Sequence, residues 1–310
     1  MTTCLVTGGA GFIGSHIVRA LLEEGAQVRV LDNFSTGKAE NLQGLNGRLE
    51  VFEADLRQAA RLDEAVRGTE VIFHEAAFVS VPHSLEDPSL CFDINLTGTS
   101  NLLDAARKAG VRRIVLASSA AVYGASTELP LKEDAPVLPH SPYALSKQIN
   151  ELFAGLFTTA YSLEAVALRY FNVYGPRQRP DSMYAAAVPI FLNRLSEAKP
   201  VEVFGDGGQT RDLIYVKDVV RANLIAARHP AAPGQVFNIC TGVETRLLDL
   251  LEVLFDLFPD AQPPVFSQPR SGDIYRSVGD SSKADRQLGF QASMGLNQGL
   301  KETVEWARSK

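Results

Sequence analysis

Short apolar runs alternate with longer segments of helical periodicity through the first half of the chain. Runs of strand length occupy 3–7, 27–31, 48–53, 70–74, 113–118 and 165–169. Apolar residues recur at helical spacing over 14–24, 59–67, 93–109 and 142–161. Strands that alternate with helices form βαβ units, which place parallel strands in one sheet with helices on both faces. The pattern therefore predicts an α/β fold with a doubly wound parallel sheet.

The pattern changes after residue 170, where prolines and glycines become frequent. We expect a smaller, loop-rich α/β lobe here, with helices over 247–258 and 296–308. A helix over 216–228 and a strand over 235–240 are predicted to return to the first sheet. The expected division is a sheet domain over 1–170, joined by 212–241, and a second lobe over 171–211 and 242–310.

Composition and charge argue against several functional classes. The 310 residues carry 30 Lys and Arg against 36 Asp and Glu, a net charge of −6, so the basic face of a nucleic-acid binder is not expected. Neither a membrane span nor a secretory signal is expected from the apolar runs. The three scattered cysteines predict small core residues in a reducing compartment, hence the cytoplasm. The five histidines lack metal-ligand spacing, so no metal is expected.

A glycine-rich turn follows the first predicted strand and opens the first helix. Gly8, Gly11 and Gly14 would let the backbone approach a pyrophosphate, which binds at the N–H groups of a helix N-terminus. Asp32 ends the second strand, where a carboxylate accepts the ribose hydroxyls and repels a 2′-phosphate; the alternative is a cap on the next turn. These features predict a Rossmann-type site for NAD rather than NADP. Asp55, after the third strand, is equally well an acceptor for the adenine amino group or a helix N-cap.

A serine, a tyrosine and a lysine carry the candidate chemistry. Tyr143 and Lys147 lie at i and i+4, so they share one face of the helix over 142–161. A nearby ammonium favours the phenolate, which would make Tyr143 a base near neutral pH. Ser119 lies at the carboxyl end of the fifth predicted strand, the edge at which such sheets bind ligands, and could relay a proton. Taken alone, a Tyr-x-x-x-Lys pair is commonly only a surface pair.

Together these residues resemble the extended short-chain dehydrogenases/reductases, in the branch of NAD-dependent epimerases and dehydratases that act on nucleotide sugars. Segments 168–176, 210–218 and 270–273 resemble second-lobe signatures of that branch, so the resemblance spans nearly the whole chain. It implies that the first domain binds NAD and that the second lobe binds a UDP-hexose. It also implies that Ser119 and Tyr143 handle the proton, while Lys147 holds the nicotinamide ribose and lowers the pKa of Tyr143.

The resemblance also assigns the remaining contacts by motif. The further implied NAD contacts are Phe12, Ile13, Asn33, Leu56, Ala76, Ala77 and Asn95. The implied UDP-sugar contacts, besides Ser119, are Ser80, Asn172, Ala187, Val188, Arg211, Arg270, Asp273 and Ser277. The two arginines also have a physical rationale, because a pyrophosphate favours planar, permanently charged donors. The alternative for each arginine is a surface salt bridge.

The residues after Ser119 separate the reaction types of the branch. Related 4,6-dehydratases carry an Asp-Glu pair at this point and decarboxylating relatives carry a Glu, whereas this chain has Ala120 and Ala121. Methyl groups cannot act as a general acid or base, so the prediction is 4-epimerisation, in which a hydride leaves the sugar C4 for NAD and returns to the other face. A decarboxylase or dehydratase on the same scaffold is the nearest alternative. A non-catalytic NAD-binding regulator is an alternative of another class.

Substrate size and assembly are the finer predictions. In the family, a tyrosine at the position of Ser277 excludes an N-acetyl group and a small residue admits it; the alternative is a loop serine without a substrate role. We therefore expect UDP-glucose and UDP-galactose as substrates, with tolerance of UDP-GlcNAc and UDP-GalNAc. Family members are often homodimers that pair through the helices over 93–109 and 142–161. Apolar residues on these helices could serve the core or a partner: Leu102, Leu103, Ala106, Ile149, Leu152, Phe153 and Leu156.

Overall fold

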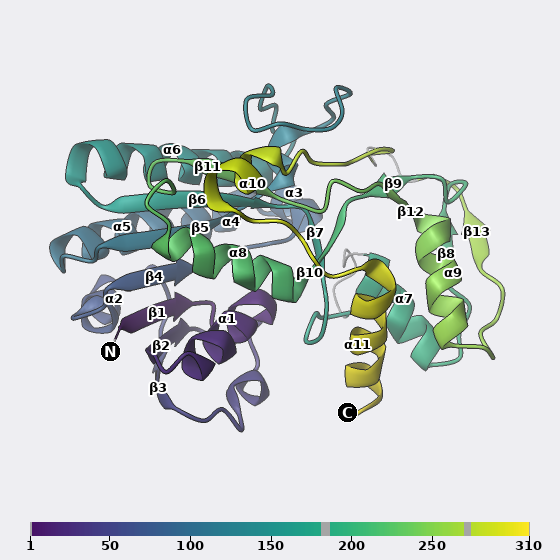
Figure 1. Ribbon diagram of the computed structural model, residues 1–310, viewed down its shortest axis with the longest axis horizontal. Helices are drawn as coiled ribbons and strands as arrows, with labels where there is room; N and C mark the ends of the chain where they lie inside the picture. Colours follow the sequence, from purple (N-terminus) through teal and green to yellow (C-terminus); the bar gives the residue numbers. More distant parts are fainter. Residues whose placement is uncertain (1, 181–186, 270–273, 310) are drawn as a thin grey trace.

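Seven parallel strands form the central sheet of the computed structural model, which describes residues 2–180, 187–269 and 274–309 (Figure 1). The strand order is β11-β6-β5-β4-β1-β2-β3. The bounds are β1 (Thr3–Thr7), β2 (Gln27–Asp32), β3 (Arg48–Glu53), β4 (Val71–His74), β5 (Arg113–Ser119), β6 (Glu164–Tyr170) and β11 (Val236–Ile239). β1 pairs with β2 on one side and with β4 on the other, so the direction of winding reverses between β1 and β4. The predicted doubly wound sheet is confirmed, and sheets of this kind bind their ligands at such a reversal, at the carboxyl ends of the strands.

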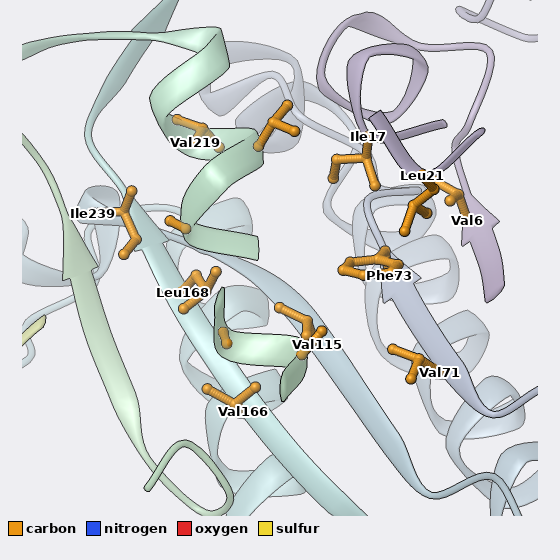
Figure 2. Packing of buried hydrophobic residues seen from close by; sticks show 14 of the residues in the cluster. Val6, Ile17, Leu21, Val71, Phe73, Val115, Val166, Leu168, Val219 and Ile239 are labelled. Atoms are coloured by element: carbon orange, nitrogen blue, oxygen red, sulfur yellow. The ribbon is translucent and has the colours of Figure 1, made fainter. Parts of the chain in front are cut away.

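Helices cover both faces of this sheet. α1 (Phe12–Glu23) and α8 (Val216–Arg228) pack against one face, while α2 (Ala59–Val66), α5 (Gly98–Lys108) and α6 (Pro142–Tyr161) cover the other (Figure 1). Because successive side chains of a strand point to opposite faces, each strand supplies two cores. Phe73 and Val115 pack in the cluster with Ile17 and Val219 (Figure 2), whereas Ile72 packs on the opposite face with α5.

The helix predicted over 93–109 is divided in two. η2 (Asp93–Thr97) is a π-helical turn, and α5 begins only at Gly98. The turn contains the buried Asn95, whose amide group is bonded to both the N–H and the carbonyl of Phe78. Short helical segments that the sequence pattern did not predict are η1 (Ala39–Leu42), α3 (Val81–Glu86), α4 (Pro88–Phe92) and η3 (Ala120–Tyr123).

Short strand pairs and three helices form the second lobe, at the right of Figure 1. β7 (Asn172–Tyr174) pairs with β10 (Leu213–Tyr215), β8 (Glu202–Phe204) pairs with β13 (Val265–Ser267), and β9 (Thr210–Arg211) pairs with β12 (Thr245–Arg246). The helices are α7 (Ala187–Ser196), α9 (Leu247–Leu257) and α11 (Leu296–Arg308). Tyr174, Val203, Tyr215, Leu254 and Leu300 are members of its buried core.

The chain crosses between the two lobes more than once. α8 and β11 lie on the main sheet, where β11 pairs with β6, and α10 (Ser282–Leu288) packs against β11 before the chain enters α11. The buried Asp212 ties this crossing together, because its carboxylate accepts bonds from the backbone N–H groups of Thr241, Gly242 and Gly279. The domain boundaries drawn from the sequence stay a prediction. Over the described ranges, no helix is long and apolar enough to cross a membrane.

Candidate active site

The glycine loop joins β1 to α1 at the point where the winding reverses. Gly8 has a φ of +66°, and a Cβ atom there would lie 2.7 Å from the backbone nitrogen of Ala76. A Cβ atom on Gly14 would lie 2.2 Å from the carbonyl oxygen of Gly8. Gly11 is the N-cap of α1 and offers no side chain to cap it, so Phe12, Ile13 and Gly14 present their backbone N–H groups in front of the loop. This cradle fits the pyrophosphate of a dinucleotide.

Asp32 closes one side of the loop at the end of β2. Its buried carboxylate accepts bonds from the backbone N–H of Ala10 at 2.9 Å and of Phe34 at 2.8 Å. Burial raises the pKa of Asp32, and the two backbone bonds oppose that rise. Each oxygen keeps a further lone pair, so the carboxylate can still accept the ribose hydroxyls predicted for it.

Asp55 has partners that the sequence did not reveal. Arg57 binds both of its oxygens, with Nε–Oδ1 at 2.8 Å and Nη2–Oδ2 at 2.9 Å, and Asn33 Nδ2 donates to Oδ2 at 2.8 Å. The Arg57 guanidinium holds the pKa of this carboxyl well below its usual range. The N-cap residue of α2 is Gln58, so the helix-cap alternative for Asp55 is wrong. An adenine amino group would have to share a carboxylate that is already well bonded.

Ser119, Tyr143 and Lys147 converge at the carboxyl end of β5. Ser141 caps α6 by accepting the N–H of Ala144 at 3.1 Å, and Pro142 occupies the first turn, so the helix begins next to Tyr143. The Ser119 hydroxyl lies close enough to the Tyr143 phenol to lower its pKa. Lys147 Nζ donates to the carbonyl of Ala117 at 2.7 Å and lies 5.8 Å from the centroid of the Tyr143 ring. These contacts bring Ser119, Tyr143 and Lys147 together at the end of β5.

The groups of the protein itself raise the pKa of Tyr143 above its ordinary value. Burial raises the pKa of Tyr143, the Ser119 bond lowers it, and the charge of Glu75 raises it again. Burial also lowers the pKa of Lys147 to about 8, which weakens the ammonium as a source of positive charge. Burial outweighs the effect of Ser119, so the pKa of Tyr143 is raised, and the role of Lys147 in making the phenol acidic stays a prediction.

Ala76, Ala77 and Asn95 lie beside the crevice, after β4 and in η2. The N–H of Ala76 is bonded to the hydroxyl of Thr7 at 3.3 Å. Asn95 Nδ2 donates to Phe78 O at 3.0 Å and to Ser146 Oγ at 2.9 Å, which ties the 76–78 segment to α6. Asn95 therefore holds the 76–78 segment in place through its hydrogen bonds to Phe78 and Ser146. Leu56 is buried, and its side chain lies 2.9 Å from where a Cβ atom on Gly98 would be.

The predicted sugar contacts lie on both lobes. Ser80 is the N-cap of α3 and accepts the N–H of His83 at 3.2 Å, so its hydroxyl already has a structural role. Asn172 begins β7 and donates to Asp212 O at 3.3 Å. Arg211 Nη1 donates to the carbonyls of Thr210 at 2.8 Å and Ile274 at 2.6 Å. These bonds hold the permanently charged guanidinium beside Ile274 in the second lobe.

The other predicted sugar contacts are less closely defined. Ala187 and Val188 begin α7, and Val188 is buried in the core of the second lobe. Ser277 is half-buried in the segment that precedes Val278. Arg270 and Asp273 lie outside the described residues.

A cavity of about 450 Å³ opens in the second lobe near these residues. Its lining residues, which sequence reasoning missed, are Phe204, Gly205, Asp206, Gln209, Ser267, Gln268, Pro269 and Tyr275. The signal that could have found them is the run 204–209, which directly precedes Thr210 and Arg211. A smaller cavity of about 250 Å³ lies beside Thr2 and Glu70, and no predicted site residue lines it. Among the residues that the structure describes, no cluster of His, Cys, Asp or Glu could hold a metal ion.

Comparisons with known proteins agree with this geometry. Residues 4–240 match the NAD dependent epimerase/dehydratase family. The chain is 41% identical to UDP-glucose 4-epimerase of Mycolicibacterium smegmatis, over 99% of this chain and 98% of that protein. It is 40% identical to a putative UDP-glucose 4-epimerase of Methanocaldococcus jannaschii, over 98% of each chain.

A solved structure and a relative of another activity complete the comparison. The fold is similar to that of UDP-N-acetylglucosamine 4-epimerase from Methanobrevibacter ruminantium M1, with a TM-score of 0.95 and 37% identity over 99% of this chain and 98% of that one. A UDP-N-acetyl-alpha-D-glucosaminuronate decarboxylase of Bacillus cytotoxicus is 32% identical over 98% of this chain and 97% of its own length. The chain is therefore an enzyme of the NAD dependent epimerase/dehydratase family, with NAD as its cofactor.

Proposed function

We propose that this enzyme is a UDP-hexose 4-epimerase that interconverts UDP-glucose and UDP-galactose. The observation that carries the proposal is the grouping of Ser119, Tyr143 and Lys147 at the end of β5, with Lys147 Nζ 5.8 Å from the centroid of the Tyr143 ring and only methyl groups at Ala120 and Ala121. This set can remove and return one proton, and residues 120 and 121 add no second acid or base. The names of the two relatives at about 40% identity support the same activity.

The chain's own residues have two tasks in this reaction, proton transfer and positioning. When bound, NAD supplies an acceptor for the hydride of the sugar C4 and a positive charge that favours the phenolate of Tyr143. Tyr143 takes the proton of the C4 hydroxyl, directly or through Ser119, and returns it after the 4-keto sugar has turned over. Lys147 has a fixed position next to Tyr143, because its ammonium donates to the carbonyl of Ala117. Hydride and proton both return to the sugar, so no second redox substrate is consumed.

The second lobe is proposed to hold the UDP group. Arg211 offers a planar, permanently charged guanidinium in this lobe, and the cavity lined by Phe204 and Tyr275 is large enough for a planar base. Binding energy from this unreacting part keeps the keto intermediate on the enzyme while the hexose rotates. We include Asn172, Arg270 and Asp273 in the same anchor.

Decarboxylation is the nearest alternative, because a decarboxylase is 32% identical to this chain. That reaction, like 4,6-dehydration, is expected to need an acid or base where this chain has Ala120 and Ala121. Release of CO2 from a UDP-uronic acid would favour this alternative over epimerisation.

The decisive experiment is an activity panel with four UDP-hexoses on the purified protein, without added NAD. We expect interconversion of the C4 stereoisomers by the parent protein. Tyr143→Phe should lower kcat by roughly 10²–10⁴-fold while UDP affinity stays unchanged, because only the proton transfer is removed. Activity of this variant within about tenfold of the parent would contradict the role of Tyr143.

Ser277 is proposed to admit an N-acetyl group beside the sugar C2, which extends the substrates to UDP-GlcNAc and UDP-GalNAc. Ser277→Tyr should abolish turnover of the N-acetyl pair and spare UDP-glucose and UDP-galactose, because a phenol ring would fill that space. Tyr275→Phe is the control, since it keeps a ring two residues away and removes only a hydroxyl that contacts Asp206. Unchanged N-acetyl activity in Ser277→Tyr would contradict this role.

We further propose a homodimer that pairs through α6, in the cytoplasm that the cysteine usage predicts. Leu145, Leu152 and Leu156 are exposed at 38%, 66% and 51%, and their spacing places them on one side of the helix. Leu102, Leu103 and Ala106 of α5 are buried and serve the core instead. Leu152→Glu should convert a dimer to a monomer, measured as mass in solution. A monomeric parent protein would refute the proposed dimer.

A further inference from the structure

Glu75 is a carboxylate beside the glycine loop that the mechanism above leaves without a role. It follows β4 directly, and its N–H donates to the carbonyl of Thr7 at 3.1 Å. A Cβ atom on Gly8 would lie 3.0 Å from its carbonyl carbon, so its main chain contacts the glycine loop. Its charge acts on both Tyr143 and Lys147. Glu75 therefore lies between the two features that a bound dinucleotide must span, the glycine loop and the catalytic helix.

A directed chain of hydrogen bonds makes Glu75 an acceptor. Asn223 Nδ2 donates to Val219 O at 2.9 Å and to the Tyr170 hydroxyl at 2.8 Å. Because an amide NH2 group can only donate, the Tyr170 oxygen accepts this bond, and its hydrogen is left to point at Glu75 Oε1, 2.8 Å away. Tyr170 and Asn223 are both buried. This arrangement stabilises the ionised carboxylate over the acid.

The charges of Lys147 and of the nicotinamide ring indicate how a carboxylate at Glu75 would affect cofactor binding. Lys147 is a buried ammonium, and the oxidised nicotinamide ring is positively charged, whereas the reduced ring is neutral. Two positive charges repel strongly where water is largely excluded. A carboxylate at Glu75 offsets the repulsion between the Lys147 ammonium and the oxidised ring. Because the reduced ring is neutral, there is no such repulsion for the carboxylate to offset when NADH is bound. The proposed reaction requires the cofactor to return to its oxidised form in every turnover.

We propose that Glu75 is a positioning residue that holds a negative charge beside Lys147 and thereby makes the site favour NAD over NADH. The inference rests on the NAD-dependent function proposed above, but not on which sugar is converted. Among the described residues, the titratable groups that face Glu75 are Lys147 and Tyr143 of α6 and Tyr170 of β6, and α8 presents the uncharged Asn223.

The test measures binding of NAD and NADH to the nucleotide-depleted full chain, without any sugar. Glu75→Gln keeps the side-chain shape and removes the charge, so we expect the preference for NAD over NADH to fall roughly tenfold at a pH near 8. Glu70→Gln is the matched control, because Glu70 is exposed at the opposite end of β4 and its loss should leave the ratio within about twofold. Tyr170→Phe should shift the ratio in the same direction as Glu75→Gln, since it removes the donor that stabilises the carboxylate.

The pH dependence of the parent protein is an independent readout. Burial raises the pKa of Glu75 to about 7, so the preference for NAD should strengthen as the pH rises from about 6 to about 8. The Glu75 charge also raises the pKa of Lys147, so the difference between the parent and Glu75→Gln reports Glu75 together with its effect on the charge of Lys147. A Glu75→Gln ratio within about twofold of the parent at a pH near 8 would overturn the proposal. An inactive sugar panel with a shifted ratio would instead contradict only the epimerase assignment.

Discussion

The buried ion pair between Glu151 and Arg169 gives a sharp test of how the catalytic helix is held. Arg169 Nε and Nη2 each donate to a different oxygen of Glu151 at 2.8 Å, and the two side chains are only 4% and 7% exposed. Ser118 Oγ donates to Glu151 Oε1 at 2.5 Å, and the guanidinium lies 4.7 Å from the centroid of the Tyr123 ring. Glu151 is one turn beyond Lys147, so the pair fixes the register of α6 against β5 and β6.

Removing either partner should be costly, and unequally so. Glu151→Ala leaves a buried guanidinium that cannot lose its proton, and it should destabilise the protein by roughly 3–5 kcal/mol. Arg169→Met leaves the Glu151 carboxylate with its bond from Ser118, so its cost should be smaller. The double variant Glu151→Leu with Arg169→Met places apolar groups of similar volume in the site and should regain most of the loss.

Thermal unfolding and steady-state kinetics provide the assay. We expect Glu151→Ala to lower Tm by roughly 5–8 °C and to lower kcat as well, since Tyr143 and Lys147 move with α6. The control is Glu64→Ala, which breaks an exposed ion pair with Arg61 and should cost less than about 1 kcal/mol. A loss in Glu151→Ala no larger than in this control would refute the claim that the buried pair holds the helix.

Two further changes test the glycine loop and the core beside it. Gly14→Ala should lose bound nucleotide and stability, because its Cβ atom would lie 2.2 Å from the carbonyl oxygen of Gly8; absorbance of released nucleotide and Tm measure both, and full nucleotide content would contradict the close packing. His74 is buried between the hydroxyls of Thr7 and Thr99, and burial lowers its pKa to about 3, so unfolding gains a proton as the pH falls below about 6.5. Stability should therefore fall by roughly 2–3 kcal/mol from pH 6.5 to about 4.5, and His74→Gln should remove this part of the slope in denaturation measured across that range.

The sheet and its helices could be predicted because their signal is periodic and local. Segments such as 3–7 and 142–161 carry the spacing of a strand or a helix in their own residues, and the glycine loop has a backbone requirement that glycine alone meets. The π-helical turn at Asp93–Thr97 could not be predicted, because it accompanies the bonds from Asn95 to Phe78, a residue 17 positions away. The short helices of the crevice lack enough residues to show a period.

The candidate catalytic residues could be predicted from the sequence, but the direction of their pKa shifts could not. Motif spacing names Ser119, Tyr143 and Lys147, whereas the direction of the Tyr143 pKa depends on burial and on Glu75, which no spacing marks. Asp55 illustrates the same limit, because its strong partner Arg57 is fixed by side-chain geometry. The second-lobe cavity is formed by two parts of the chain about sixty residues apart, so only the folded chain brings them together. They are residues 204–209 on one side and Ser267, Gln268, Pro269 and Tyr275 on the other.

The repeated crossing between lobes also determines which fragments can exist. A polypeptide that stopped after β6 would lack α8 and β11, so β6 would become an open edge and the apolar residues that now face Val219 and Ile239 would meet water. Such a half-length product would be prone to self-association. The central sheet can therefore be completed only after the ribosome has synthesised the chain through β11.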